Sequence, residues 1–309
     1  MQLQRIHHTE FDVARLSYGC MRIAGTWNHD EVTPARWEAG EKAVIAAYEA
    51  GYTLFDHADI YCRGRCEEIH GSVMKKIPSM RKAIVIATKC GIRFPGDPRH
   101  DSPHRYDFSA QHIIESCEKS LERLGVETID IYQLHRPDLL MNPAEVAEAF
   151  EKLHSAGKVR YFGVSNFLPS FVNALQSGLS APLVVNQVEI HLGRLDCFYD
   201  GTLDQCLEKK LTPLSWSPLG GGWLGTGGKT SDLLRLQVQD VLDIKAAHYG
   251  TSRTAIALAW LLMHPSQVIP IIGSVNPENI REATSADKIE LTREDWYNIL
   301  VAARGKGLP

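Results

Sequence analysis

The stretch L-F-D-H-A-D-I-Y, residues 54–61, decides the fold that this sequence predicts. Its first two residues are apolar, as at the end of a buried strand, and titratable groups follow. A buried carboxylate without a partner costs on the order of several kcal/mol, so Asp56 needs a nearby cation. We therefore expect a strand that ends near Asp56 and a loop that presents Tyr61, with the cation supplied by a neighbouring strand.

The same unit of strand, loop and helix recurs along the chain. Residues 83–88, A-I-V-I-A-T, are apolar or β-branched on both faces, which is typical of a parallel strand covered on both sides. Eight strands that alternate with helices predict an α/β protein, a closed (β/α)8 TIM barrel with its active site at the C-terminal ends of the strands. The expected strands are residues 16–21, 52–55, 83–88, 129–134, 159–164, 183–188, 212–216 and 267–272.

Segments outside this repeat complete the predicted architecture. Residues 3–7 and 12–16 alternate around a polar turn and predict a short N-terminal β-hairpin, and extra helices are expected at 231–249 and 292–304. No linker or composition shift divides the chain, so we expect a single domain over 1–309. An open doubly wound sheet is the alternative, weakened because no G-x-G-x-x-G follows the first strand. The other expected helices are residues 35–50, 65–77, 109–124, 143–156, 168–177, 200–210, 252–263 and 277–286.

Composition narrows the class of function. The net charge of −4 comes without a basic block, so the electrostatic footprint of a nucleic-acid binder is not evident. No run of 18 or more apolar residues exists, which argues against a membrane span, and the polar first ten residues lack a signal-peptide core. We expect a cytoplasmic protein, as a monomer or weak oligomer, whose seven scattered cysteines stay reduced.

One pair of cysteines is a weak candidate for a metal site. Cys62 and Cys66 form a C-x3-C pair close in sequence to His57 and His70. Structural zinc sites usually combine two such pairs, and the sequence has no second one. We expect no metal.

Polar or aromatic residues stand at the C-terminal end of seven expected strands. Because these ends meet on one rim of a barrel, the residues should converge there, and converging titratable groups are typical of active sites. Each residue alone could have a purely structural role, such as a loop cap or a surface lysine. Their shared placement at strand ends favours a role in an active site. The residues are Asp56 and Tyr61, Lys89, His135, Ser165 and Asn166, Asn186 with Gln187 and Glu189, Trp216, and Gly273 with Ser274 and Asn276.

The chemistry that these residues suggest is proton transfer by a tyrosine. A free tyrosine titrates at about 10, and a nearby cation favours its phenolate. Lys89 can supply that cation, with Asp56 as its counter-charge, and His135 can hydrogen-bond a carbonyl oxygen. None of these groups supplies a hydride, so a bound cofactor must. Trp216 can stack on a nicotinamide ring, beside carboxamide partners at Ser165, Asn166 and Gln187.

The motifs resemble those of the aldo-keto reductase family. The matching segments are F-D-H-A-D-I-Y, A-T-K, Q-L-H-R-P, G-V-S-N-F, W-S-P-L-G and I-G-S-V-N-P-E-N-I-R-E-A, which together span essentially the whole chain. The opening G-C-M-R-I-A-G-T-W and the ending L-T-R-E-D-W-Y are similar to the bacterial YdhF-like branch.

This resemblance implies a fold, a reaction and a set of sites. It implies a (β/α)8 barrel that reduces aldehydes or ketones with NADPH, in which Tyr61 is the general acid of a tetrad with Asp56, Lys89 and His135. NADH stays open, because the positions that often carry cations for the adenosine 2′-phosphate look like 273–275 and Asn279 here. The residues implied to bind the cofactor are Ser165, Asn166, Gln187, Trp216, Ser217, Leu219, Gly273, Ser274, Asn279 and Glu282.

A small carbonyl substrate should bind among loops 22–30, 91–107 and 218–230 and the tail 304–309, with Trp27, Phe94 and Trp223 forming an apolar pocket. These aromatics could equally pack the loops onto the barrel. Two rival functions remain: a cofactor-sensing binding subunit with little turnover, and, less well supported, a metal-dependent barrel hydrolase.

Overall fold

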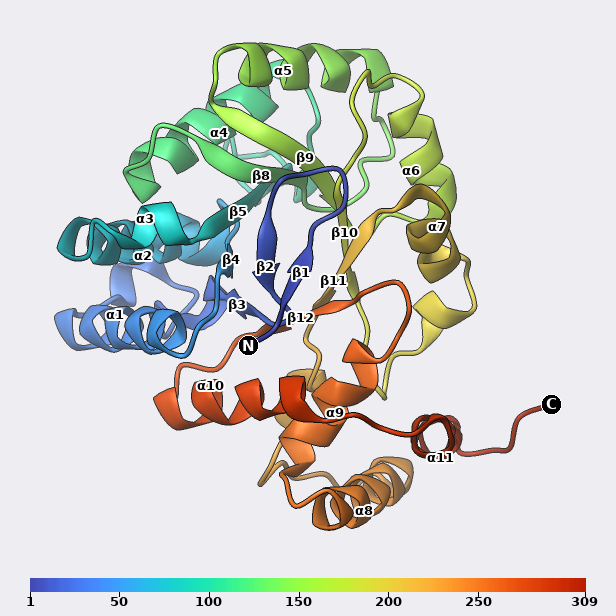
Figure 1. Ribbon diagram of the computed structural model, residues 1–309. Helices are drawn as coiled ribbons and strands as arrows, with labels where there is room; N and C mark the ends of the chain where they lie inside the picture. The colour runs from blue at the N-terminus through green and yellow to red at the C-terminus, as the bar shows by residue number, and fades with distance from the viewer.

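The computed structural model describes residues 1–309, and its centre is a closed barrel of eight parallel strands (Figure 1). Each strand pairs with the next barrel strand along the chain, and β12 closes the ring against β3. The expected fold is therefore confirmed. The barrel strands are β3 (Ser17–Gly19), β4 (Leu54–Asp56), β5 (Val85–Cys90), β8 (Ile129–Leu134), β9 (Val159–Ser165), β10 (Val185–Glu189), β11 (Thr212–Trp216) and β12 (Ile269–Ile272).

Successive side chains along each strand point alternately into the barrel interior and outward toward the helices. In β8, Ile131 belongs to the interior cluster, whereas the neighbouring Tyr132 packs in the cluster beneath the helices. The same alternation in β5 turns Val85 and Ala87 inward. Lys89 continues this inward series, so the barrel directs its side chain toward the C-terminal end of the interior.

The predicted N-terminal hairpin covers one end of the barrel. Strands β1 (Leu3–Arg5) and β2 (Asp12–Ala14) pair antiparallel, and Figure 1 looks onto this hairpin where it lies across the barrel opening. Ile6, Phe11 and Val13 pack in one cluster with interior residues of the barrel strands. The hairpin therefore closes the N-terminal end and leaves the opposite end for a site.

Helices surround the barrel, and both expected extra helices, α8 and α11, are present and pack against each other. Local sequence explains several ends: Thr33 caps α1 ahead of Pro34, and Gly125 ends α4 in a left-handed conformation. The helices are α1 (Pro34–Glu49), α2 (Arg65–Lys76), α3 (Met80–Ala83), α4 (Ala110–Leu124), α5 (Pro143–Ser155), α6 (Pro169–Gln176), α7 (Thr202–Lys209), α8 (Leu233–His248), α9 (Arg253–Leu262), α10 (Pro277–Ala283) and α11 (Arg293–Arg304).

Several elements differ from the expected ones. Residues 80–83 form the short helix α3, so the strand expected at 83–88 is β5, Val85–Cys90, and Lys89 lies within it rather than after it. The helix expected at 277–286 ends at Ala283, where a 3-10 turn continues the chain. A further two-stranded ribbon joins β6 (Ile92–Arg93) to β7 (Arg105–Tyr106) in the loop 91–107, where no strand was expected. All seven cysteines are buried free thiols, and none of the helices combines the length and apolar character needed to span a bilayer.

Candidate active site

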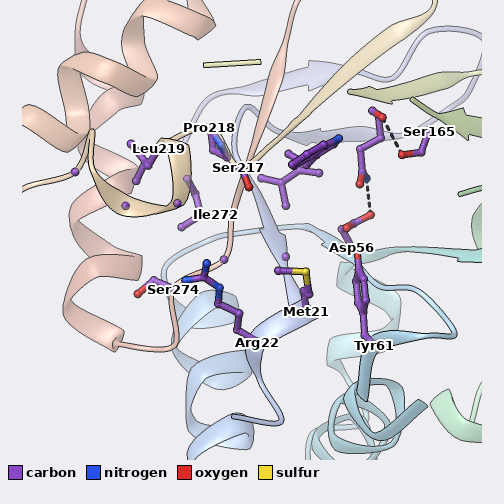
Figure 2. Close-up of a pocket in the computed structure, with 18 of the residues that line it drawn as sticks. Met21, Arg22, Asp56, Tyr61, Ser165, Ser217, Pro218, Leu219, Ile272 and Ser274 are labelled. Atoms are coloured by element: carbon purple, nitrogen blue, oxygen red, sulfur yellow. Dashed lines mark hydrogen bonds between the residues drawn. The ribbon is translucent and has the colours of Figure 1, made fainter. Parts of the chain in front are cut away.

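A cavity of about 460 Å³ lies at the C-terminal ends of the barrel strands. Figure 2 shows Asp56 and Tyr61 toward one end of it and Leu219 and Ser274 toward the other. Nearly all of the predicted site residues line this cavity. Those that do are Trp27, Asp56, Tyr61, His135, Ser165, Asn166, Gln187, Trp216, Ser217, Leu219, Gly273, Ser274, Asn279 and Glu282.

Lys89 does not line the cavity, but its side chain contacts Asp56 and Tyr61, which do. Its Nζ donates to the Asp56 carboxylate at 2.8 Å, to the His57 carbonyl at 2.6 Å and to the Tyr61 hydroxyl at 3.3 Å. The side chain is fully buried. Burial alone would lower the pKa of Lys89, but Asp56 and Tyr61 outweigh it and raise that pKa. Lys89 is therefore the cation that Asp56 needs, and it stays charged.

The backbone around Tyr61 is unusual. Cys62 and Arg63 both have left-handed conformations, with φ of 46° and 50°, and Gly64 follows with φ of 90°. Two such non-glycine residues in a row cost conformational energy, which proteins concentrate at functional sites. The turn carries the chain from the loop after β4 into α2 and holds the Tyr61 hydroxyl near Lys89.

The pKa of Tyr61 departs from the expectation. Burial, the larger influence, raises it to about 12, while Lys89 acts in the opposite direction. Lys89 thus favours the phenolate, as expected, but burial of the ring, which the sequence did not reveal, outweighs it. At neutral pH Tyr61 carries its proton and can donate it.

His135 is a neutral imidazole beside this pair. Burial, followed by the charges of Lys89 and Arg136, lowers its pKa well below the ordinary value. Its ring meets that of Tyr61 edge to face, with centroids 5.9 Å apart, and its Nδ1 has no hydrogen-bond partner. A neutral imidazole at this position can donate one hydrogen bond to a substrate oxygen without adding a charge.

The residues predicted to hold a nicotinamide bind one another. Asn166 accepts a hydrogen bond from Trp216 Nε1 at 2.9 Å and donates to the His135 carbonyl at 3.2 Å. Its φ of 62° is left-handed, which asparagine tolerates better than most residues. The Ser165 hydroxyl donates to the Gln187 carbonyl at 2.8 Å, and Gln187 Nε2 donates to Asp56 at 2.7 Å. Because Asn166 also donates to the Ser165 hydroxyl at 2.8 Å, this network connects the Trp216 indole to the Asp56 carboxylate.

The far end of the cavity is polar and carries one carboxylate. Glu282 accepts a hydrogen bond from the Thr226 hydroxyl at 2.6 Å, and Ser274 and Asn279 lie in the same lining. The Arg22 side chain extends toward Ser274 in Figure 2. Asn276 does not line the cavity; it caps α10 instead.

The expected substrate pocket is only partly present. Trp27 lines the cavity and meets the Tyr61 ring at 6.3 Å between centroids. Phe94 lies outside the lining, with the Arg63 guanidinium 4.6 Å from its ring centroid. Trp223 also lies outside, because it packs in the core beneath the α8 side of the barrel. The tail 304–309 contributes no residue to the lining.

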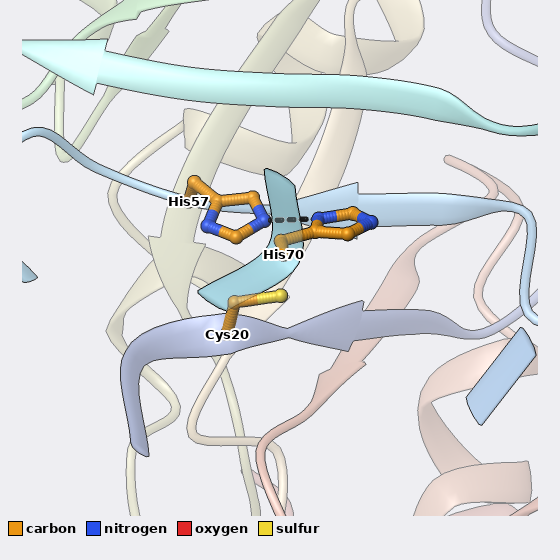
Figure 3. Close-up of side chains that lie close together, drawn as sticks. All are labelled: Cys20, His57 and His70. Carbon is orange, nitrogen blue, oxygen red and sulfur yellow. Dashed lines mark hydrogen bonds between the residues drawn. The ribbon is translucent and has the colours of Figure 1, made fainter. Parts of the chain in front are cut away.

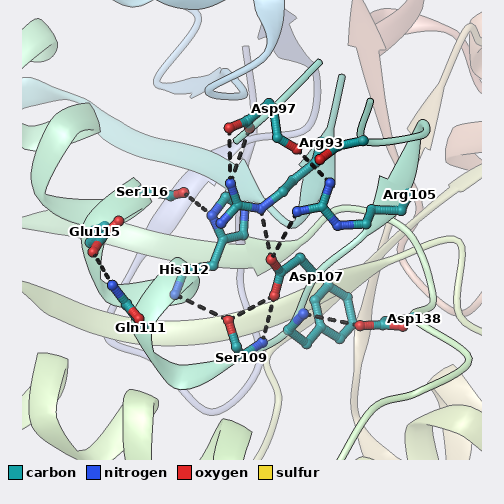
Figure 4. Close-up of polar contacts among 12 residues, drawn as sticks. Arg93, Asp97, Arg105, Asp107, Ser109, Gln111, His112, Glu115, Ser116 and Asp138 are labelled. Carbon is teal, nitrogen blue, oxygen red and sulfur yellow. Dashed lines mark hydrogen bonds and ion pairs between the residues drawn. The ribbon is translucent and has the colours of Figure 1, made fainter. Parts of the chain in front are cut away.

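Ion pairs and hydrogen bonds within the loop 91–107 stabilise it, and most of the loop does not line the cavity. Arg93 binds Asp107 at 2.7 Å and Asp97 at 3.1 Å, and Arg105 donates to the Asp97 carbonyl (Figure 4). Only Ile92 of this loop reaches the cavity lining. Its basic residues therefore stabilise the β6–β7 ribbon.

Sequence reasoning missed several lining residues. Arg136 follows His135 directly, so its position after a strand was a usable signal. Thr226 and Thr254 come from a loop and a helix whose packing the sequence pattern does not reveal. Ile60 and Ile92 supply apolar walls near Tyr61. These five residues line the same cavity as the predicted ones.

A second group of polar residues lies behind the site. Cys20, His57 and His70 place their potential ligand atoms within 4.8 Å of one another, all fully buried (Figure 3). His57 Nε2 and His70 Nδ1 are already hydrogen-bonded at 2.7 Å. This bond occupies one nitrogen of each ring, and His57 Nδ1 and His70 Nε2 have no hydrogen-bond partner. The main-chain carbonyl of His57 accepts from Lys89.

The cavity suits a dinucleotide with an aromatic head. A partly exposed indole at Trp216 stands beside amide and hydroxyl groups, and the opposite end offers hydroxyls, an amide and a guanidinium. Between them, a Cβ added at Gly221 or Gly222 would meet no atom within 4 Å, so this part of the lining leaves open space. The donors and acceptors present therefore fit a nicotinamide cofactor.

Comparisons with known proteins agree with this geometry. The Aldo/keto reductase family model matches residues 15–302. The 6-dehydroglucose reductase of Novosphingobium aromaticivorans is 40% identical, covering 99% of this chain and 97% of the relative. Oxidoreductase YdhF of Escherichia coli is 39% identical, covering 88% of this chain and 91% of the relative. The predicted resemblance, including its YdhF-like branch, is confirmed.

A solved structure supports the likeness in three dimensions. An aldo/keto reductase from Klebsiella pneumoniae, in complex with NADP and acetate, superposes with a TM-score of 0.75 at 25% identity. The match covers 93% of this chain and 90% of that chain.

Proposed function

Because the chain belongs to the aldo/keto reductase family, we propose that it reduces an aldehyde or ketone to an alcohol, with NADPH as hydride donor and Tyr61 as proton donor. The observation that carries this proposal is the 3.3 Å contact between the charged Lys89 and the Tyr61 hydroxyl at the end of the cavity. Residues 1–309 act as one domain, since segments as far apart in the chain as β3 and α10 line that one cavity.

The protein's own residues account for the proton side of the reaction. Tyr61 is protonated at neutral pH and donates its proton to the carbonyl oxygen as that oxygen gains charge. The ammonium of Lys89 stabilises the negative charge left on Tyr61 Oη, and Asp56 keeps the ammonium in place. His135 donates a hydrogen bond to the same oxygen, as donors aimed at a developing oxyanion do.

The other side of the site holds the cofactor. A reduced nicotinamide supplies a hydride when bound. Trp216 would carry the nicotinamide ring on its indole face, and Ser165, Asn166 and Gln187 would hold the carboxamide. The remainder of the cofactor would be held by Ser217, Leu219, Gly273, Ser274, Asn279 and Glu282, which line the same cavity.

Arg22 favours a phosphorylated cofactor. The positions expected to recognise the phosphate, residues 273–275 and Asn279, carry no charge. Arg22 reaches the same end of the cavity from a different strand end and takes no part in any ion pair. Guanidinium groups bind phosphate bidentately, so Arg22 supplies the missing cation. The NADP in the Klebsiella relative agrees with this assignment.

Cofactor titration followed by a carbonyl panel tests the proposal. NADPH and NADH are each titrated against intrinsic tryptophan fluorescence, which Trp216 and Trp27 should report. Steady oxidation of the bound cofactor is then followed with simple aldehydes, ketones and 6-dehydroglucose, the substrate in the name of the Novosphingobium relative. Cofactor binding without turnover of any carbonyl, together with a stable partner complex, would instead identify a sensor subunit.

A further inference from the structure

Two arginines of the cavity have no acidic partner. Arg22 and Arg136 both line it, and neither takes part in an ion pair or a side-chain hydrogen bond. Arg93, which follows the cavity residue Ile92, instead binds two aspartates. The two carboxylates of the cavity are also engaged, Asp56 by Lys89 and Glu282 by Thr226. The cavity therefore presents two free guanidinium groups.

The two arginines serve different ends of the cavity. Arg22 extends toward Ser274, at the end away from Tyr61 (Figure 2). Arg136 follows His135 in the chain, and its guanidinium carbon lies 5.5 Å from the centroid of the Trp216 ring. It also contributes to the lowered pKa of His135. Arg136 therefore lies at the end of the cavity that carries His135 and Trp216, and not at the end that Arg22 reaches.

The remaining walls near Tyr61 do not provide a second polar anchor of this kind. Trp27, Ile60 and Ile92 are apolar and line the cavity on this side. A substrate that enters between them meets two groups that handle the carbonyl oxygen, Tyr61 and His135, and one cation. A guanidinium held only by stacking on an indole can turn toward a ligand without breaking an ion pair.

We propose that Arg136 forms a substrate subsite that binds acceptor oxygens, a carboxylate or hydroxyl groups, on the carbonyl compound. The proposal rests on the proposed reductase function and deepens it, because it assigns the class of substrate: an aldehyde or ketone that carries such oxygens rather than a plain hydrocarbon carbonyl. A carboxylate is the stronger ligand, since two parallel hydrogen bonds match its geometry and carry charge.

Matched substrate pairs test the subsite. The first pair is 4-carboxybenzaldehyde with benzaldehyde, for a carboxylate; the second is glyceraldehyde with propanal, for hydroxyls. Wild type should show a higher kcat/KM for the oxygen-bearing member of at least one pair. Arg136→Gln should reduce that preference about tenfold or more, mainly through KM. Arg136→Lys should restore part of a carboxylate preference, because charge is kept and the planar fork is lost.

Arg22→Gln is the matched control, since it removes an equally free guanidinium from the other end. It should weaken NADPH binding and leave both preference ratios unchanged. If Arg136→Gln lowers activity equally for all four substrates, or weakens NADPH binding without changing the ratios, Arg136 serves the fold or the cofactor and the inference is wrong.

A binding measurement tests the Arg136 subsite independently of the proposed reductase activity. Benzoate and benzyl alcohol are titrated against the NADPH-loaded protein by tryptophan fluorescence, in wild type and Arg136→Gln. A benzoate preference that disappears in the variant supports a carboxylate subsite even if no aldehyde is turned over, an outcome that would contradict only the reductase proposal. Equal benzoate affinity in both proteins, together with unchanged ratios in both substrate pairs, overturns the subsite.

Discussion

The Nζ of Lys89 lies 3.3 Å from the hydroxyl oxygen of Tyr61, although the two residues are 28 positions apart in the chain. Asp56 holds the ammonium from the other side at 2.8 Å. This relationship links a buried ion pair to the hydroxyl that we propose as the proton donor. It also decides how variants of the three residues should differ.

Tyr61→Phe should abolish carbonyl reduction and preserve cofactor binding. The change removes only the hydroxyl, and Lys89 keeps Asp56 as its partner, so the buried charge remains compensated. Loss of a positioned general acid typically lowers the rate by about 100-fold to 10,000-fold. Steady-state kcat is compared with the NADPH dissociation constant from fluorescence. Wild-type activity in this variant would exclude Tyr61 as the proton donor.

The rate of reduction should vary little with pH between about pH 6 and about pH 9, a range that lies between the ordinary titrations of histidine and tyrosine. The pKa of Tyr61 is raised to about 12, so its proton is lost only well above this range. The pKa of His135 is lowered well below its ordinary value, so this ring is neutral throughout. The measurement is kcat for one aldehyde across the range with saturating cofactor. A decline in kcat centred near pH 8 would show that Tyr61 ionises far more readily than burial allows.

Arg22→Gln should weaken NADPH binding more than NADH binding. A charge-assisted hydrogen bond contributes about 1.5–3 kcal/mol, which corresponds to a rise of about tenfold or more in the dissociation constant. The two cofactors are titrated by fluorescence in wild type and variant, at two salt concentrations because exposed charges are screened. Equal weakening of both cofactors would assign Arg22 to the phosphates that they share.

His70→Phe should destabilise the fold without removing a site residue. It leaves His57 Nε2 without its 2.7 Å partner in a fully buried position, which costs about 1–3 kcal/mol. The free energy of unfolding is measured by urea titration, with the exposed His154→Gln as control. An unchanged midpoint in His70→Phe would show that the histidine pair adds nothing to stability.

The same histidines predict a pH dependence of stability. Burial lowers the pKa of His70 to about 3, and that of His57 falls well below 6.5. Between these values and their ordinary pKa, the unfolded chain binds more protons than the folded one, so stability falls as the pH drops below about 6.5. His70→Phe should reduce this slope. A stability that rises on acidification would contradict the neutral, buried pair.

The site residues that the sequence predicted correctly are those at the C-terminal ends of the strands. Asp56, His135 and Trp216 lie at or just beyond C-terminal strand ends, and the closed parallel barrel brings such ends to one rim, so the sequence pattern located them. Phe94 and Trp223 were misplaced, because an aromatic in a loop can pack outward or inward and the pattern does not distinguish the two. Arg136 also lies just beyond a strand end but was not predicted. Its proposed role in substrate binding rests on the lack of an ion-pair partner, which the sequence does not show.

The sequence by itself determined the barrel, because alternation of buried strands and capped helices is encoded locally, and it determined that Asp56 needed a cation. Only the tertiary structure decided the consequences. It showed that burial outweighs Lys89 and keeps the Tyr61 proton in place, since desolvation depends on every neighbour around the ring. It also showed which arginines are free, because ion pairing is a property of distances between segments far apart in the chain. The stretch 54–61 supplies Tyr61, the proposed proton donor, and β5, the next strand of the barrel, supplies the Lys89 charge beside it.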